Sequence, residues 1–192
     1  MKAVFLDRDG TINIDGNGYI SKTEDFKLYP FAPEAIKMLN DAGFLVFVVT
    51  NQSGIARGYY TLADLDKLHS KMKNILAEIG AKIDDIFISP YHIEGKIEPF
   101  NIDHEDRKPG LGMLKKAMAK YPIELKHSFM VGDRYTDIEF GRKANLQTIL
   151  VKTGMGEEEF KQRKNWKKYP HFVVENLLDA AKLIIEIENE KN

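Results

Sequence analysis

The chain has 192 residues, of which 43% are hydrophobic and 30% charged, and its formal net charge is −1. This composition is typical of a globular domain, and a charge so close to zero excludes a global attraction to nucleic acid or anionic membranes. The chain has no cysteine, which excludes disulfides, a thiol nucleophile and cysteine-ligated zinc. No apolar run approaches the roughly 18 residues that span a bilayer, and no basic-then-apolar leader precedes the first strand, so a cytoplasmic location is expected.

The first part of the chain begins an alternation of strand and helix patterns. Ala3–Leu6 is a short apolar run that predicts a buried strand. Residues 11–30 are polar and contain glycine and asparagine, which predicts an irregular excursion. Pro33 then opens a helix that Gly43 ends, and Phe44–Val49 predicts a second buried strand.

The middle of the chain continues the alternation with a longer helix. Thr61 and Asp64 form a variant of the capping box, and the helix behind them is expected to end at Gly80. Residues 86–89 predict a third strand, and residues 90–109 form a loop whose length suggests a function. The residues that this helix is expected to place in the core are Leu62, Leu65, Leu68, Met72, Ile75, Leu76 and Ile79.

The last part of the chain repeats the pattern with shorter elements. Helices are predicted over 111–120 and 137–144, and strands over 128–131, 147–151 and 172–174. A final docking helix is predicted from the spacing of Leu177, Leu178, Ala181, Ile184 and Ile185. The alternation favours an α/β, Rossmann-like fold with a parallel sheet and helices on both faces. We expect one domain over residues 1–192, with no room for a separate cap domain.

Polar side chains stand where several of these strands end. Asp7 and Asp9 follow the first strand, Thr50 ends the second, and Asp133 follows a later one. In open α/β sheets, ligands bind beyond the carboxyl ends of the strands. Two carboxylates there can hold a hard cation, and one can attack phosphorus while the other moves a proton. A lone pair of acids or a lone threonine is more commonly structural, so the prediction depends on the whole set occurring in this order.

Four segments resemble the four motifs of the haloacid dehalogenase superfamily of phosphatases. Residues 7–11 resemble motif one, 48–54 motif two, 107–109 motif three and 131–137 motif four. The string over 50–58 is similar to the branch that holds the D-glycero-D-manno-heptose 1,7-bisphosphate phosphatases and the histidinol-phosphate phosphatases. The resemblance implies a Mg²⁺-dependent phosphomonoester hydrolase of carbohydrate metabolism.

The resemblance also implies a role for each site residue. Asp7 is the expected nucleophile that forms an aspartyl-phosphate, and Asp9 the expected acid and base. Thr50 and Lys108 are expected to hold the phosphoryl group. The Mg²⁺ ligands implied are Asp7, Asp133 and the backbone carbonyl of Asp9, and Asp137 is expected to orient Lys108 or a metal-bound water. The expected substrate-binding residues are Asp15, Gly18, Tyr19, Asn51, Gln52, Ser53, Arg57, Arg107 and Arg134.

The resemblance implies a heptose bisphosphate as the substrate, and a guanidinium, which can hold a second phosphate through two hydrogen bonds, suits a bisphosphate. Histidinol phosphate is the alternative substrate. A phospho-receiver domain is a different class, but its middle strand would end in a carboxylate, and here residues 49–51 contain none. An inactive phosphate-binding protein finds no support, since every catalytic side chain is present. The expected partner is a small phosphorylated molecule, with no nucleic acid or membrane, and the expected state is a monomer or weak homo-oligomer.

The loop before motif three departs from the resembling family, in which it often holds a structural zinc through cysteines and a histidine. Ser89, Tyr91, His104 and Asp106 stand at the ligand positions here. Serine and tyrosine are poor zinc ligands and no thiolate remains, so a structural zinc is not expected. Another metal held by His92, His104 and Asp106 is the alternative.

The segment from Lys161 to Lys168 mixes basic residues with Trp166. Such a mixture can contact a nucleic acid or a polyphosphate. A solvated face with one packed tryptophan is the preferred interpretation, because the net charge of the chain is nearly neutral.

Overall fold

A computed structural model describes residues 1–16 and 18–190, and its centre is a six-stranded sheet. The strands lie in the order β3-β2-β1-β4-β5-β6, and each neighbouring pair is parallel. The predicted α/β fold with a parallel sheet is therefore confirmed. The strands are β1 (Ala3–Leu6), β2 (Leu45–Asn51), β3 (Asp85–Ser89), β4 (Phe129–Gly132), β5 (Gln147–Val151) and β6 (Phe172–Val174).

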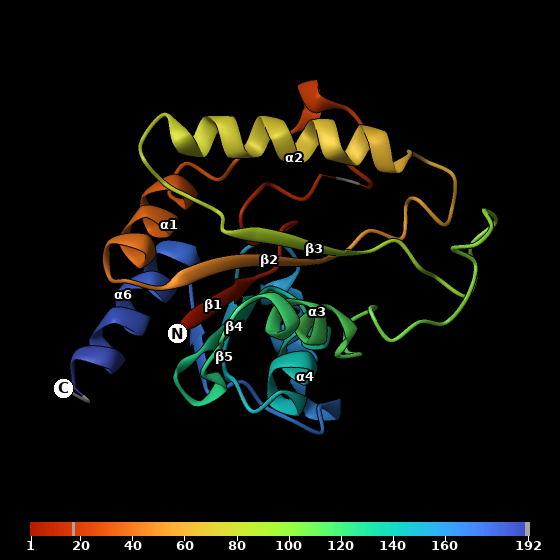
Figure 1. The fold of residues 1–192 in the computed structure, drawn as a ribbon. Helices are drawn as coiled ribbons and strands as arrows, with labels where there is room; N and C mark the ends of the chain where they lie inside the picture. The colour runs from red at the N-terminus through yellow and green to blue at the C-terminus, as the bar shows by residue number, and fades with distance from the viewer. Residues whose placement is uncertain (17, 191–192) are drawn as a thin grey trace.

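Helices cover both faces of the sheet, with α2 on one side and α3 and α4 on the other (Figure 1). The α-helices are α1 (Ala32–Asp41), α2 (Leu62–Ala77), α3 (Gly112–Lys120), α4 (Tyr135–Lys143), α5 (Gly156–Lys161) and α6 (Leu177–Asn189). Three short 3-10 helices occur at Thr23–Asp25, Leu125–His127 and Arg163–Asn165. Within the described residues, no helix combines the length and the apolarity that crossing a bilayer requires.

Alternate residues of β1 divide the core into two layers. Val4 and Leu6 face a layer that includes α1, α2 and α6, whereas Ala3 and Phe5 face a layer that includes α3 and α4. All four side chains have no solvent exposure. A strand buried on both faces needs a continuous apolar run, which explains the run that the sequence shows.

The order of the strands decides where the site lies. The chain winds outward from β1 to β3 and then returns to place β4 on the other side of β1. Leu6 pairs with Val131, so the polar residues that follow these two strands emerge side by side. This is the topological switch point, where open α/β sheets form a crevice for ligands.

The structure corrects several predicted details. Leu62 and Ile79 are 40% and 45% exposed rather than buried, because Leu62 is the first residue of α2 and Ile79 lies beyond its last. Helix α4 begins at Tyr135, two residues earlier than predicted. Helix α5 was not predicted, since its six residues are too few for a clear apolar periodicity. The expected domain over 1–192 includes residues 17, 191 and 192, which lie outside the described residues.

Candidate active site

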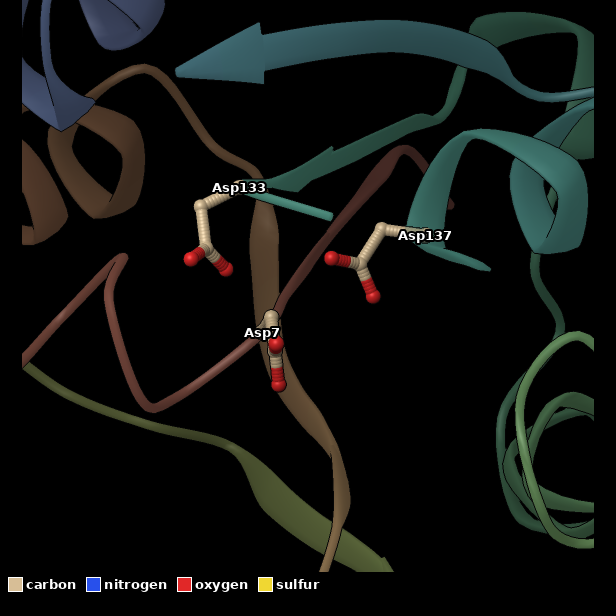
Figure 2. A group of neighbouring side chains, drawn as sticks. All are labelled: Asp7, Asp133 and Asp137. Atoms are coloured by element: carbon tan, nitrogen blue, oxygen red, sulfur yellow. The ribbon is translucent and has the colours of Figure 1, made fainter. Parts of the chain in front are cut away.

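Three carboxylates converge at the switch point. Asp7 follows β1, Asp133 follows β4, and Asp137 lies in the first turn of α4 (Figure 2). Each offers an oxygen within 4.8 Å of the others, and within the described residues they form the only group of three or more acids or histidines close enough to share an ion. Asp7 is 7% exposed, and the other two are fully buried. Such a cluster needs cations to balance it.

Lys108 supplies one of these cations from the floor of the site. Its Nζ lies 3.0 Å from Asp7 Oδ1 and 2.6 Å from Asp137 Oδ1, and it donates to the carbonyl of Val49 at 2.7 Å. Burial opposes the charge on Lys108, but Asp137 and Asp7 outweigh it and raise the pKa of the ammonium. The amide of Asn51 bonds both the backbone N–H and the carbonyl of Lys108, at 2.9 and 3.1 Å. Lys108 is therefore held as a charged group against Asp7.

The remaining negative charge points to a divalent cation. The pKa of Asp7 is raised to about 6. Burial is the largest cause, Lys108 opposes it, and the charges of Asp137 and Asp9 add to the increase. Burial also raises the pKa of Asp133 well above its usual value, and Asp7 adds to this effect. Asp133 Oδ2 accepts from the N–H of Met155 at 2.8 Å, but its buried Oδ1 has no hydrogen-bond partner within the described residues. A carboxylate with a free oxygen beside a second carboxylate fits a hard cation.

A glycine makes room for Asp133. Gly10 has a φ of +79°, a conformation that other residues rarely adopt. A Cβ at Gly10 would lie 2.3 Å from Asp133 Oδ2. The glycine of motif one is thus needed for the close approach of the first loop to the carboxylate of motif four.

Asp9 lies beside this cluster and is held from several sides. The guanidinium of Arg8 donates to both carboxylate oxygens, at 2.8 and 2.9 Å, and the amides of Asn13 and Gln52 donate at 3.0 and 2.9 Å. Burial disfavours the negative charge of Asp9, but Arg8 and these hydrogen bonds favour that charge more strongly, so the pKa of Asp9 is lowered. Arg8 and Asn13 were not among the predicted site residues. An arginine directly between two motif aspartates was the available signal.

Asp7 of this cluster lines a cavity of about 730 Å³, whereas Asp133 and Asp137 are not among its lining residues. Thr50 is 1% exposed at its wall, and its hydroxyl accepts from the Gln52 amide at 2.9 Å. All nine residues predicted to bind substrate line the cavity, as do Asp7, Asp9 and Lys108. His92, considered above only as a metal ligand, also lines it, and the lining residues that were not predicted are Arg8, Gly16, Ile20, Tyr60, Tyr135, Thr136, Met155 and Glu159.

Comparison with known proteins identifies the family. Residues 106–180 match the HAD-hydrolase-like family model. The D-glycero-beta-D-manno-heptose-1,7-bisphosphate 7-phosphatase of Pasteurella multocida is 42% identical over 95% of this chain and 96% of its own length. The enzyme of the same name from Escherichia coli K12 is 41% identical over 79% of this chain and 80% of its own length. The chain belongs to this phosphatase family. The resemblance inferred from the four motifs is therefore confirmed.

A solved structure of the family supports the same assignment. The D,D-heptose 1,7-bisphosphate phosphatase of B. bronchiseptica, complexed with magnesium and phosphate, is 30% identical and has a TM-score of 0.85. The match covers 97% of this chain and 99% of that chain. The phosphatase fold thus extends over nearly the whole chain.

The three cavity arginines that were predicted to bind substrate differ in their partners. Arg57 pairs with Glu94 at 3.1 Å, and Arg134 pairs with Asp15 at 3.4 Å. Arg107 donates to the carbonyl of Tyr91 at 3.3 Å, and no carboxylate of the described residues lies within 4.0 Å of its guanidinium. Burial lowers the pKa of Arg107, and the charge of Arg57 adds to this effect. An anion bound beside Arg107 would stabilise its charge against both burial and the repulsion from Arg57.

The loop expected to lack zinc is held by other contacts. Tyr91 stacks on His104 with ring centroids 3.9 Å apart. The carboxylate of Asp106 pairs with Lys116, and its backbone N–H donates to His104 Nδ1. The ring stack and the hydrogen bond thus join Tyr91, His104 and Asp106, and the ion pair ties Asp106 to α3.

The basic segment near the C-terminal end carries one packed aromatic, as expected. Trp166 is 8% exposed and stacks on Tyr135 with ring centroids 4.8 Å apart. Tyr135 in turn lines the cavity. The tryptophan therefore supports one wall of the site.

Proposed function

We propose that this protein is a Mg²⁺-dependent phosphatase that removes the 7-phosphate from D-glycero-D-manno-heptose 1,7-bisphosphate through an aspartyl-phosphate on Asp7. The observation that carries the proposal is the position of Asp7 in the lining of the cavity, beside both Lys108 and the carboxylate of Asp133. Relatives that span nearly the whole chain carry the name of this reaction.

The reaction has two steps. In the first, the Asp7 carboxylate attacks phosphorus, the bond from phosphorus to the sugar oxygen breaks, and Asp9 gives that oxygen a proton. In the second, Asp9 takes a proton from water, the water attacks the aspartyl-phosphate, and phosphate leaves with Asp7 restored. The ammonium of Lys108 and the hydroxyl of Thr50 hold the phosphoryl oxygens throughout. Asp137 keeps Lys108 charged and in place.

Asp7 and Asp133, with the backbone carbonyl of Asp9, would hold the Mg²⁺. The free Oδ1 of Asp133 supports this assignment. When bound, the ion supplies positive charge that offsets the repulsion between a carboxylate nucleophile and a phosphate dianion. Asp137 is engaged by Lys108 and by the N–H of Arg134, so we assign it to Lys108 rather than to the ion.

A substrate panel tests this proposal. Relatives named for the beta and for the alpha anomer are 42% and 41% identical, so both anomers of the bisphosphate belong in the panel. Histidinol phosphate and small sugar phosphates complete it. We expect Mg²⁺-dependent phosphate release to be fastest with a heptose bisphosphate. A faster reaction with histidinol phosphate would contradict the proposed substrate but not the proposed chemistry.

Replacing Arg107 by alanine should reduce kcat/KM for the bisphosphate by about 10–100-fold, because hydrogen bonds to charged groups contribute roughly 1.5–3 kcal/mol. Arg107 is the cavity arginine without a carboxylate partner within the described residues, so we assign it to the phosphate that is not cleaved. For a monophosphate that lacks this second phosphate, the variant's kcat/KM should fall much less. Steady-state kinetics with both substrates measure the difference.

Lys108→Ala is the matched control, because it serves the phosphoryl group that both substrates share. It should impair both alike. If Arg107→Ala also impairs both substrates equally, then Arg107 serves the chemical centre, and the argument for a bisphosphate from this arginine fails.

The purified protein should contain no stoichiometric zinc, and a zinc-selective chelator followed by Mg²⁺ should leave its activity intact. The reason is that a ring stack and the Asp106–Lys116 pair occupy the family's zinc positions. Elemental analysis measures the metal content. One tightly held zinc per chain would contradict this prediction.

We further infer that the chain acts as a single capless domain, in a monomer or weak homo-oligomer. The presence of all six strands in one sheet supports the single domain. A cytoplasmic location and the absence of nucleic-acid and membrane partners stay predictions from the sequence.

A further inference from the structure

The proposed reaction gives no role to Arg8, a buried charge beside Asp9. Arg8 is 1% exposed and is among the largest fully buried side chains of the protein. Its Nη2 donates to both oxygens of Asp9, and its Nε donates to Oδ1 at 3.1 Å. A buried guanidinium is costly unless its other N–H groups are also bonded.

The outer edge of this guanidinium contacts α2. Nη1 of Arg8 lies 3.1 Å from Nε2 of His69, which is 7% exposed. Arginine can only donate, so Nε2 must accept, and the imidazole must be neutral with its proton on Nδ1. Burial and the charge of Arg8 lower the pKa of His69 to about 3, which agrees with a neutral ring. His69 thus joins a helix 61 residues away in sequence to the residue beside Asp9.

The other contacts of Asp9 come from loops. Asn13 donates to Oδ1 and Gln52 to Oδ2, and the Gln52 amide is itself held by the hydroxyl of Tyr60 at 2.5 Å. Arg8 is the only one of these partners that contacts both oxygens of Asp9. Its position therefore has the largest influence on the plane of the carboxylate.

We propose that His69 is a positioning residue for proton transfer by Asp9, acting through Arg8. Without an acceptor at His69, Nη1 of Arg8 is left buried and unpaired, so the guanidinium turns toward another partner. The Asp9 carboxylate, bonded to it at three places, turns with it. Proton transfer requires the acid within hydrogen-bond reach of the leaving oxygen, so this displacement slows bond cleavage. The inference rests on the proposed function only in taking Asp9 as the acid.

The test compares two leaving groups. An alkyl phosphate such as the heptose 7-phosphate needs a proton on its leaving oxygen, whereas p-nitrophenyl phosphate releases a stabilised anion. His69→Leu removes the acceptor and keeps an apolar side chain of similar size. It should lower kcat for the alkyl substrate by about 10–100-fold, a part of the 10²–10⁴-fold that a general acid typically supplies. With p-nitrophenyl phosphate, the loss should stay below about threefold, since no proton is needed.

Two further variants separate positioning from packing. His69→Gln places an amide oxygen near the position of Nε2, so it should keep an acceptor for Arg8 and restore the alkyl activity. Ser70→Ala changes an exposed neighbour on the same helix and should leave both activities unchanged. If His69→Leu does not fold, as judged by circular dichroism, then His69→Asn replaces it. Its shorter amide does not reach Arg8, so it should show the same difference between substrates.

Asp9→Asn is the reference for the acid itself. It should also lower kcat for the alkyl substrate more than for p-nitrophenyl phosphate, and the loss with the alkyl substrate should exceed that of His69→Leu. If Asp9→Asn impairs both substrates equally, then the acid role in the proposed function is wrong. If Asp9→Asn shows the difference but the His69 variants impair both substrates equally, or neither, then the positioning role of His69 is overturned.

Discussion

Asp7→Asn is expected to lower kcat by about 10³-fold or more, while the protein still folds. Asparagine has nearly the same shape as aspartate, but its amide is a very poor nucleophile. The variant also removes one charge from a crowded group of carboxylates, and Lys108 keeps its contact with Asp137 at 2.6 Å. The folded structure should therefore tolerate the change.

Single-turnover phosphate release and thermal unfolding measure the two parts of this prediction. Mass spectrometry of quenched wild-type enzyme should detect a phosphorylated Asp7 peptide that the variant lacks. Asp41→Asn is a suitable control, because Asp41 is an exposed residue of α1 that pairs with Lys37. If Asp7→Asn keeps a tenth of the wild-type activity, Asp7 is not the nucleophile.

The order of the elements could be predicted because its signals are local. Short apolar runs predict strands, and Ala3–Leu6, Gln147–Val151 and Phe172–Val174 were predicted with the bounds that the structure has. The capping box of Thr61 and Asp64 is also present. The predictions of buried residues failed at the two ends of α2. Leu62 and Ile79 follow the apolar periodicity of this helix, but they are exposed because they do not pack against the core.

The residues of the candidate site could be predicted because strand ends and motifs mark them. Their partners could not. The sequence places Asn51 in a loop near substrate, but only the structure reveals that its amide holds the backbone of Lys108. Likewise, the contact between Arg8 and His69 depends on how α2 packs against the first loop. No local pattern encodes a contact of that kind.

The electrostatics of the site also required the structure. Spacing alone tells that Asp7 and Asp9 are close, but not that burial raises the pKa of Asp7 while Arg8 lowers that of Asp9. Two aspartates that are two residues apart thus differ in their environment.

Asp133→Ala should raise the Mg²⁺ concentration needed for half-maximal activity by at least about 10-fold, or lower the rate at saturating Mg²⁺ by about 100-fold. Changing even a residue that only supports a metal ligand typically costs about 10–100-fold, and Asp133 is proposed as a direct ligand. Its buried, unpartnered Oδ1 is the atom whose loss should matter. Magnesium titrations followed by activity and by calorimetry measure the effect.

Asp133→Asn separates loss of the ion from damage to the loop. Asp133 Oδ2 also accepts from the N–H of Met155, and an asparagine oxygen can keep that bond while the negative charge is lost. If the negative charge of Asp133 is what binds the ion, both Asp133→Ala and Asp133→Asn should bind Mg²⁺ weakly. If asparagine restores activity and Mg²⁺ affinity, Asp133 serves mainly to hold the loop at Met155. Wild-type rates and Mg²⁺ dependence in both variants would remove Asp133 from the metal site, and the cation would then have to be held by Asp7 and Asp137, with loss of the contact between Asp137 and Lys108.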